Sequence, residues 1–130
     1  MQTYFEKDFF VISCDKNNEV IVVEWKTPPT SQEFKDSMNV VVEALQYFNT
    51  GKVIFDTVAL GVLLDADQEW ISSDWYVRAV KVGYSRVAFV LPKDAFTDMF
   101  VKETVKRTSD RIPTAYFENR MAAIEWMNEV

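Results

Sequence analysis

The stretch KVIFDTVALGVLLDADQEW, which covers residues 52–70, decides the fold of this chain. Its first residues form a short apolar run without alternation, as expected of a central strand whose two faces are both covered. An apolar loop follows, and Asp65 then stands where it can accept from the first free amides of a helix, with Gln68 completing a capping pattern. A strand, a loop and a helix in this order are typical of the edge where open α/β sheets place their working surface.

The residues before this stretch predict a hairpin and a helix. Residues 9–14 and 20–25 are rich in β-branched and aromatic side chains and flank a polar turn, so we expect an antiparallel pair. Residues 30–33 read Thr-Ser-Gln-Glu, which has the spacing of a capping box, and apolar residues then recur at steps of three and four. The pattern indicates a helix that lies on the sheet and ends near Gly51.

The residues after the stretch alternate between helices and strands. We expect a helix over residues 65–82, a strand over 86–91, a helix over 95–108, a strand over 114–117 and a last helix capped by Asn119. The order is then β-β-α-β-α-β-α-β-α, and such crossovers make the later strands parallel. The predicted fold is an α/β domain with a mixed sheet of about five strands and about four helices.

Composition limits the range of functions. The chain has 130 residues, 48% of them hydrophobic, which suits a single compact domain over residues 1–130. Its net charge of -6 argues against nucleic acid and anionic lipid as partners. Cys14 is the only cysteine, no apolar run is long enough to span a bilayer, and acidic Glu6 and Asp8 stand where a signal peptide would carry positive charge. We therefore expect a cytoplasmic protein without membrane insertion.

Several phrases of the sequence together resemble a known family. They are Leu60-Gly61-Val62-Leu63, Asp67-Gln68-Glu69-Trp70-Ile71 with Trp75 and Arg78-Ala79, Ala88-Phe89-Val90 with Pro92 and Asp94, and Tyr116-Phe117-Glu118 with Ala122 and Trp126. With these phrases and the expected order of elements, nearly the whole chain resembles the STAS/SpoIIAA-like domains found as small stand-alone bacterial proteins. The resemblance implies that fold and a role in regulation or small-ligand binding.

The resemblance also raises the question of a phosphorylation switch. In the anti-sigma-factor antagonists of the STAS fold, a Ser or Thr at the start of the second helix is phosphorylated, and its charge switches partner binding. The matching turn here is Leu-Asp-Ala-Asp at residues 64–67, and the nearest hydroxyls are those of Thr57, Ser72 and Ser73. We expect no phosphorylation at this turn and interpret Asp65 as a helix cap, with a permanent substitute for the phosphate as the alternative.

Catalysis is not expected. The chain has no His, so Cys14 or a Ser would lack its usual base. The carboxylates at the start of the second helix fall on different sides of that helix and do not converge on a metal ion. Asp56, at the end of its strand, lacks the neighbours of a phosphoaspartate site and is expected to accept from loop amides. We predict no enzyme, no catalytic residue, no cofactor and no metal site.

The second helix carries more apolar surface than contact with one sheet requires. The stripe expected to face the sheet consists of Ile71, Trp75, Ala79 and Val82. A second set, expected to project elsewhere, consists of Trp70, Tyr76, Val77 and Val80. Loops of the same chain, a twin subunit, a protein partner or an apolar small molecule are its candidate covers, and we favour self-association. Arg78 is expected to pair with Asp74, with a ligand carboxylate or phosphate as its alternative partner.

The leading hypothesis is a non-enzymatic regulatory or protein-interaction module that uses the second helix and the loop of residues 57–64 as its contact surface. The alternative is a small carrier of an apolar ligand or lipid, suggested by the apolar loop and by the likeness of such domains to lipid-transfer folds of the CRAL-TRIO type. The candidate binding surface comprises Leu60, Val62, Asp65, Trp70, Asp74, Trp75, Val77, Arg78 and Val80.

Overall fold

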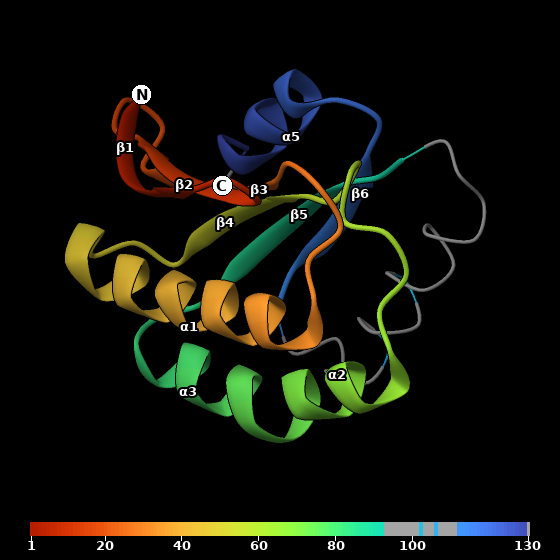
Figure 1. The fold of residues 1–130 in the computed structure, drawn as a ribbon. Helices are drawn as coiled ribbons and strands as arrows, with labels where there is room; N and C mark the ends of the chain where they lie inside the picture. Colours follow the sequence, from red (N-terminus) through yellow and green to blue (C-terminus); the bar gives the residue numbers. More distant parts are fainter. Residues whose placement is uncertain (93–101, 103–105, 107–111, 130) are drawn as a thin grey trace.

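Figure 1 shows the computed structural model of the chain, in which residues 1–92, 102, 106 and 112–129 are described. One mixed sheet forms the centre of the molecule, and helices cover both of its faces. The strands are β1 (Gln2–Lys7), β2 (Phe10–Asp15), β3 (Val20–Trp25), β4 (Lys52–Asp56), β5 (Arg86–Val90) and β6 (Thr114–Phe117). The helical elements are α1 (Ser31–Phe48), α2 (Asp65–Trp70), the π-helical turn η1 (Ile71–Trp75), α3 (Tyr76–Lys81) and α5 (Arg120–Met127).

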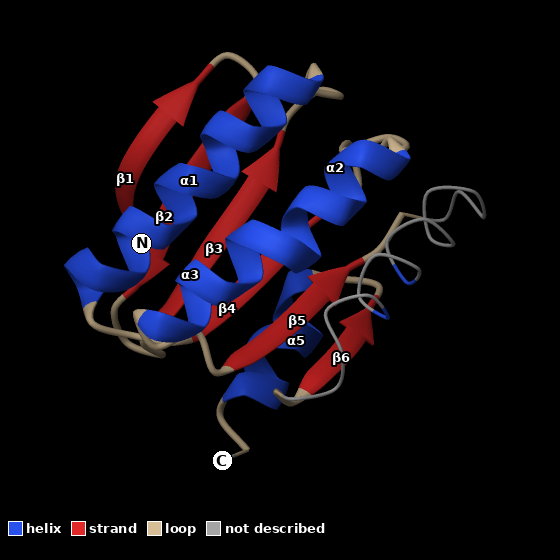
Figure 2. Cartoon of the chain, turned by 90° about the horizontal axis from the view of Figure 1, so that it is seen from below, coloured by secondary structure: helices blue, strands red, loops and turns tan. Residues whose placement is uncertain are grey.

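The six strands lie in the sheet in the order in which they follow along the chain. β1, β2 and β3 form an antiparallel meander, and β3, β4, β5 and β6 run parallel. Figure 2 shows α1 and the α2–η1–α3 stretch side by side over one face of the sheet, with α5 behind the other face. The predicted α/β class, the hairpin and the parallel later strands are confirmed.

The predicted number of strands is wrong, and one predicted helix falls outside the described residues. The sheet has six strands and not about five, because β1 was not expected. β1 is an edge strand whose residues are exposed or half-buried, so it lacks the apolar run that identified the other strands. The predicted helix over residues 95–108 lies outside the described residues, apart from Lys102 and Lys106.

Helix starts follow the predicted chemistry at both ends of the fold. Thr30 and Glu33 form a complete capping box at α1: the Thr30 hydroxyl accepts from the Glu33 amide at 3.1 Å, and the Glu33 carboxylate accepts from the Thr30 amide at 2.9 Å. Asn119 caps α5, since its side-chain oxygen accepts from the Ala122 amide at 2.9 Å. Both helices therefore begin where the sequence predicted.

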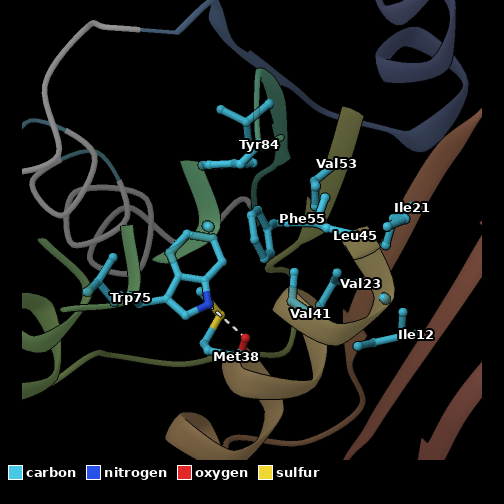
Figure 3. Close-up of a cluster of buried hydrophobic side chains, with 14 of the residues drawn as sticks. Ile12, Ile21, Val23, Met38, Val41, Leu45, Val53, Phe55, Trp75 and Tyr84 are labelled. Carbon is cyan, nitrogen blue, oxygen red and sulfur yellow. Dashed lines mark hydrogen bonds between the residues drawn. The ribbon is translucent and has the colours of Figure 1, made fainter. Parts of the chain in front are cut away.

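The core has two parts, one on each face of the sheet. The larger part lies between the sheet and the pair formed by α1 and the α2–η1–α3 stretch (Figure 3). The smaller part lies under α5 and consists of Val20, Val22, Ile54, Ala88, Val90, Ala123 and Met127. Val53 and Phe55 of β4 enter the larger part while Ile54 enters the smaller one, so both faces of β4 are covered, as its sequence predicted.

A buried tryptophan links the two neighbouring helical stretches that cover the larger part of the core. The indole nitrogen Nε1 of Trp75 donates to the Met38 carbonyl of α1 at 2.7 Å, the dashed line in Figure 3. A buried indole N–H needs a partner of this kind. The hydrogen bond therefore links the α2–η1–α3 stretch to α1 within the core.

Candidate functional site

The loop between β4 and α2, residues 57–64, lies at the carboxyl end of the parallel strands. Leu60 and Leu63 of this loop belong to the core, whereas Val58, Val62 and Leu64 are 54%, 54% and 61% exposed. The loop thus alternates between anchors in the core and aliphatic side chains in solvent. We call the three exposed side chains the edge surface.

The backbone of this loop is held at several points. The Thr57 amide and hydroxyl both donate to the Val90 carbonyl, at 2.9 and 2.8 Å, and the Val58 amide donates to Asp56 Oδ1 at 3.2 Å. Gly61 has a φ of +80°, and a Cβ at this position would lie 3.2 Å from Pro28 Cβ. The edge surface is therefore presented by an anchored loop.

The predicted cap of the second helix is wrong. The residue in the cap position is Leu64, whose carbonyl accepts from the amides of Asp67 and Gln68, both at 3.0 Å, and which makes no side-chain cap. Asp65 is already the first helical residue and is exposed. A cap residue needs extended backbone for its side chain to reach the following amides. Gln68 does not complete a capping pattern either, since its side chain donates to the Leu63 carbonyl at 3.1 Å.

Asp67, which the sequence did not single out for this position, is the carboxylate that the fold uses at the start of α2. It is buried, and its Oδ1 accepts from the Ser31 hydroxyl at 2.6 Å. Ser31 is the first residue of α1, so this bond places the first turns of α1 and α2 side by side. A carboxylate in the first turn of a helix interacts favourably with the helix dipole. Asp67 therefore places a carboxylate in the first turn of α2, beside the first turn of α1.

A second carboxylate, Asp56, anchors α5 to the same edge of the sheet. Its Oδ2 accepts from Nε of Arg120 at 2.8 Å, and the same guanidinium donates through Nη2 to Glu24 Oε1 at 2.9 Å. Burial alone would lower the pKa of Arg120, but its hydrogen bonds to Glu24 and Asp56 raise it above its ordinary value. Asp56 accepts from a loop amide as predicted, and Arg120 is an ionic partner that the sequence did not reveal.

The π-helical turn changes which side chains of the second helix face the core. Ile71, Trp75 and Ala79 are buried, as predicted. Tyr76, predicted to project elsewhere, is also buried, and its ring meets that of Tyr84 edge-on with centroids 6.0 Å apart. A π-helical turn holds more residues than an α-helical turn, so the side chains after it are rotated relative to an α-helical projection. Tyr76 therefore does not belong to the apolar surface that was expected on the outside of the second helix.

Trp70 lies where α2 meets α1 and α3. Its ring is half-buried at the junction with α1, where Lys35 Nζ and Arg78 Cζ each lie 5.8 Å from the ring centroid. Arg78 pairs with Asp74 at 3.4 Å, as predicted, and also donates to Asn39 Oδ1 of α1 at 2.8 Å. We call Lys35, Trp70 and Arg78 the cationic junction.

The nine residues predicted as a binding surface therefore occupy different environments. Leu60 and Trp75 are core residues and are not part of an exposed surface, and Trp75 was also predicted to lie in the stripe that faces the sheet. Trp70, Asp74 and Arg78 gather at the cationic junction, whereas Val62 and Asp65 are exposed near the start of α2, and Val77 and Val80 are exposed on α3.

The reactive groups of the described residues offer little for catalysis. Cys14 is buried in β2, and burial raises the pKa of its thiol, which disfavours the nucleophilic thiolate. Ser72 and Ser73 both donate to the Glu69 carbonyl, at 3.1 and 2.8 Å. Within the described ranges, no group of three His, Cys, Asp or Glu residues is placed to hold a metal ion. None of the helices described is both long enough and apolar enough to cross a bilayer.

Comparison with known proteins does not assign this chain to a family. No protein-family model matches the chain, and no curated protein matches it. The resemblance to STAS/SpoIIAA-like domains accordingly stays a prediction from the sequence.

Proposed function

We propose that this chain is a non-enzymatic protein-interaction module with a regulatory role, of STAS/SpoIIAA-like type, and that its partner docks on the edge surface. The observation that carries the proposal is the exposure of Val58, Val62 and Leu64 on a loop whose backbone is anchored to β4 and β5. Neighbouring exposed aliphatic side chains on an ordered loop are typical of contact surfaces.

The same loop supports an interaction module over an apolar-ligand carrier. A carrier needs the apolar side chains of such a loop to line an enclosed space. Leu60 and Leu63 fill the core instead, and the three side chains of the edge surface face solvent. This division leaves the loop an outward-facing apolar surface, which suits a macromolecular partner.

The proposed regulation works without phosphorylation at the start of α2. Asp67 already provides a buried carboxylate there, hydrogen-bonded to Ser31. The nearest upstream hydroxyl, Thr57, is 2% exposed and donates to a backbone carbonyl, so a kinase would have to unfold this loop to reach it. Partner binding would therefore be controlled by the amount of protein or by the partner, and not by a charge added at this turn.

The test compares partner capture by variants of the exposed aliphatic residues. Wild-type protein and Leu64→Glu are cross-linked in extracts of the cells that produce the protein, and bound proteins are quantified by mass spectrometry. Val77→Glu is the matched control, because it places the same charge at an exposed valine on α3. We expect a partner that Leu64→Glu loses and Val77→Glu retains. Equal capture by the wild type and Leu64→Glu contradicts the proposal.

A further inference from the structure

We propose that the cationic junction formed by Lys35, Trp70 and Arg78 binds an acidic segment of a partner protein, with an Asp or Glu carboxylate on the cations and an apolar side chain on the indole. The inference rests on the proposed function, because it assigns a partner chemistry to the interaction module. It concerns a different surface from the loop of residues 57–64.

The geometry places two cations around one aromatic ring that solvent can reach. Lys35 approaches the ring from α1 and Arg78 from α3, each at 5.8 Å from the centroid, within the range of a cation–π contact. Trp70 is half-buried, so part of its indole is open to contact. An amphipathic ring of this kind supplies a large contact area at a low entropic cost.

Most of the hydrogen-bonding capacity of these cations is unused. A guanidinium carries five N–H donors in a fixed fork, which suits bidentate binding of a carboxylate. Within the described part of the chain, Arg78 uses only Nη2, toward Asn39 and Asp74. Lys35 makes no ion pair with any described residue. The exposed Asp74–Arg78 pair, at 3.4 Å, is too weak to prevent the approach of a second carboxylate.

Charge decides which occupant fits the junction. The chain carries a net charge of -6, but at physiological ionic strength exposed charges are screened beyond about 8 Å, so the groups at contact decide, and there the two cations Lys35 and Arg78 outnumber the Asp74 carboxylate. A second copy would bring the same net charge to the contact, which disfavours self-association here. Binding to anionic lipid typically uses clusters of about 4–8 basic residues. An acidic segment of a different protein matches the junction better than either.

The indole signals of the protein provide a site-specific assay. Trp25 and Trp75 donate their indole N–H groups to Ser37 and to the Met38 carbonyl inside the core, so their signals serve as internal controls. A synthetic peptide rich in Glu, Asp, Leu and Phe is titrated into the labelled protein, and proton–nitrogen correlation spectra are recorded. The signal of Trp70 is assigned with Trp70→Phe. We expect it to shift while those of Trp25 and Trp75 stay in place.

Charge variants test whether the cations carry the binding. Lys35→Gln combined with Arg78→Gln should weaken peptide binding by about twofold to thirtyfold, the range expected for the loss of two exposed ion pairs. Lys7 is the last residue of β1, and Lys16 lies in the turn between β2 and β3. Lys7→Gln combined with Lys16→Gln removes the same charge from these positions and should leave the affinity unchanged. Unfolding curves of both double variants confirm that the fold is retained.

Three results overturn the inference: no shift of the Trp70 signal at millimolar peptide, equal binding of a peptide with Lys in place of each acidic residue, or a shift produced only by vesicles that contain phosphatidylserine. The proposed function fails separately. If Leu64→Glu still removes partner capture in any of these cases, the interaction module stands and only the acidic partner is lost. If the peptide binds as expected but Leu64→Glu captures partners like the wild type, the junction stands and the edge surface falls.

Discussion

Replacement of Arg120 by Met tests how the edge of the sheet is held together. The change removes the charge of Arg120 and keeps an aliphatic stem, so both ion pairs are lost with little loss of packing. The pair with Glu24 joins side chains that are 37% and 39% exposed and contributes at most about 1 kcal/mol. The Asp56 side chain is only 12% exposed, and leaving a carboxylate there without its cation costs about 1–3 kcal/mol.

After a discount for the partial exposure of Arg120, we expect Arg120→Met to lower the free energy of unfolding by about 2 kcal/mol. For a domain of this size the change corresponds to a fall of about 6–10 °C in Tm. Urea unfolding followed by tryptophan fluorescence measures the free energy, and thermal unfolding followed by circular dichroism measures Tm.

Double-mutant cycles divide the effect between the two partners of Arg120. The coupling energy between Arg120→Met and Asp56→Asn should exceed that between Arg120→Met and Glu24→Gln, because the less exposed carboxylate is the one less stabilised by water. A wild-type Tm for Arg120→Met refutes the reasoning. A larger coupling to Glu24 than to Asp56 refutes the division by burial.

The remaining predictions concern the core, the exposed face of α3, the turn at α2 and the loop. Ile54→Asp should prevent folding, because it buries an unpaired charge on the central strand, whereas Ile54→Val should keep a cooperative unfolding transition. Self-association through the exposed valines of α3 predicts a wild-type dimer that Val80→Glu dissociates into a folded monomer, and a wild type that sediments as a monomer at high micromolar concentration would refute it. Intact-mass measurement of protein from its native cells should show no phosphate on residues 64–67, and a phosphate mapped to Thr57, Ser72 or Ser73 that alters partner binding would disprove the loss of the switch. Gly61→Ala should destabilise the fold by about 1–2 kcal/mol in urea unfolding, because its φ is +80°, and an unchanged midpoint would contradict the need for glycine.

Strands buried on both faces could be predicted from the sequence, whereas the edge strand could not. β3, β4 and β5 are apolar runs because each contacts helices on both sides of the sheet, and this environment leaves a direct trace in the sequence. β1 needs no such run, since its outer edge faces solvent. Tyr4 is its main attachment to a helix, through ring contacts with Tyr47 and Phe48 of α1, and a single aromatic residue does not identify a strand.

The buried face of the second helix could be predicted from the sequence except for Tyr76. The sequence stripe assumed regular α-helical spacing, and that spacing placed Trp75 and Ala79 in the core. The π-helical turn over Ile71–Trp75 then brought Tyr76 into the core as well. No residue of that turn has a conformational preference strong enough to predict a π-helical turn from the sequence. Such turns depend on how the whole helix packs.

The long-range hydrogen bonds and ion pairs of the site belong to contacts that only the fold creates. Ser31 and Asp67 are 36 residues apart, and Asp56 and Arg120 are 64 residues apart. A cap or an i,i+4 pair, such as Asp74 with Arg78, lies within one turn and leaves a local spacing that can be read. Long-range partners leave no spacing, so the sequence identified Asp56 as an acceptor of a loop amide but gave no sign of its cation.

These long-range bonds bear on the proposed function, because they hold the loop on which the proposed docking surface lies. Ser31 with Asp67 holds the far end of the loop of residues 57–64 against α1, and Asp56 holds its near end while also binding Arg120 of α5. A loop fixed at both ends cannot fold its aliphatic side chains inward without breaking one of these bonds. The exposure of the edge surface is therefore imposed by the buried polar contacts beneath it, and a partner that covers Val62 and Leu64 gains apolar burial without first paying to order the loop.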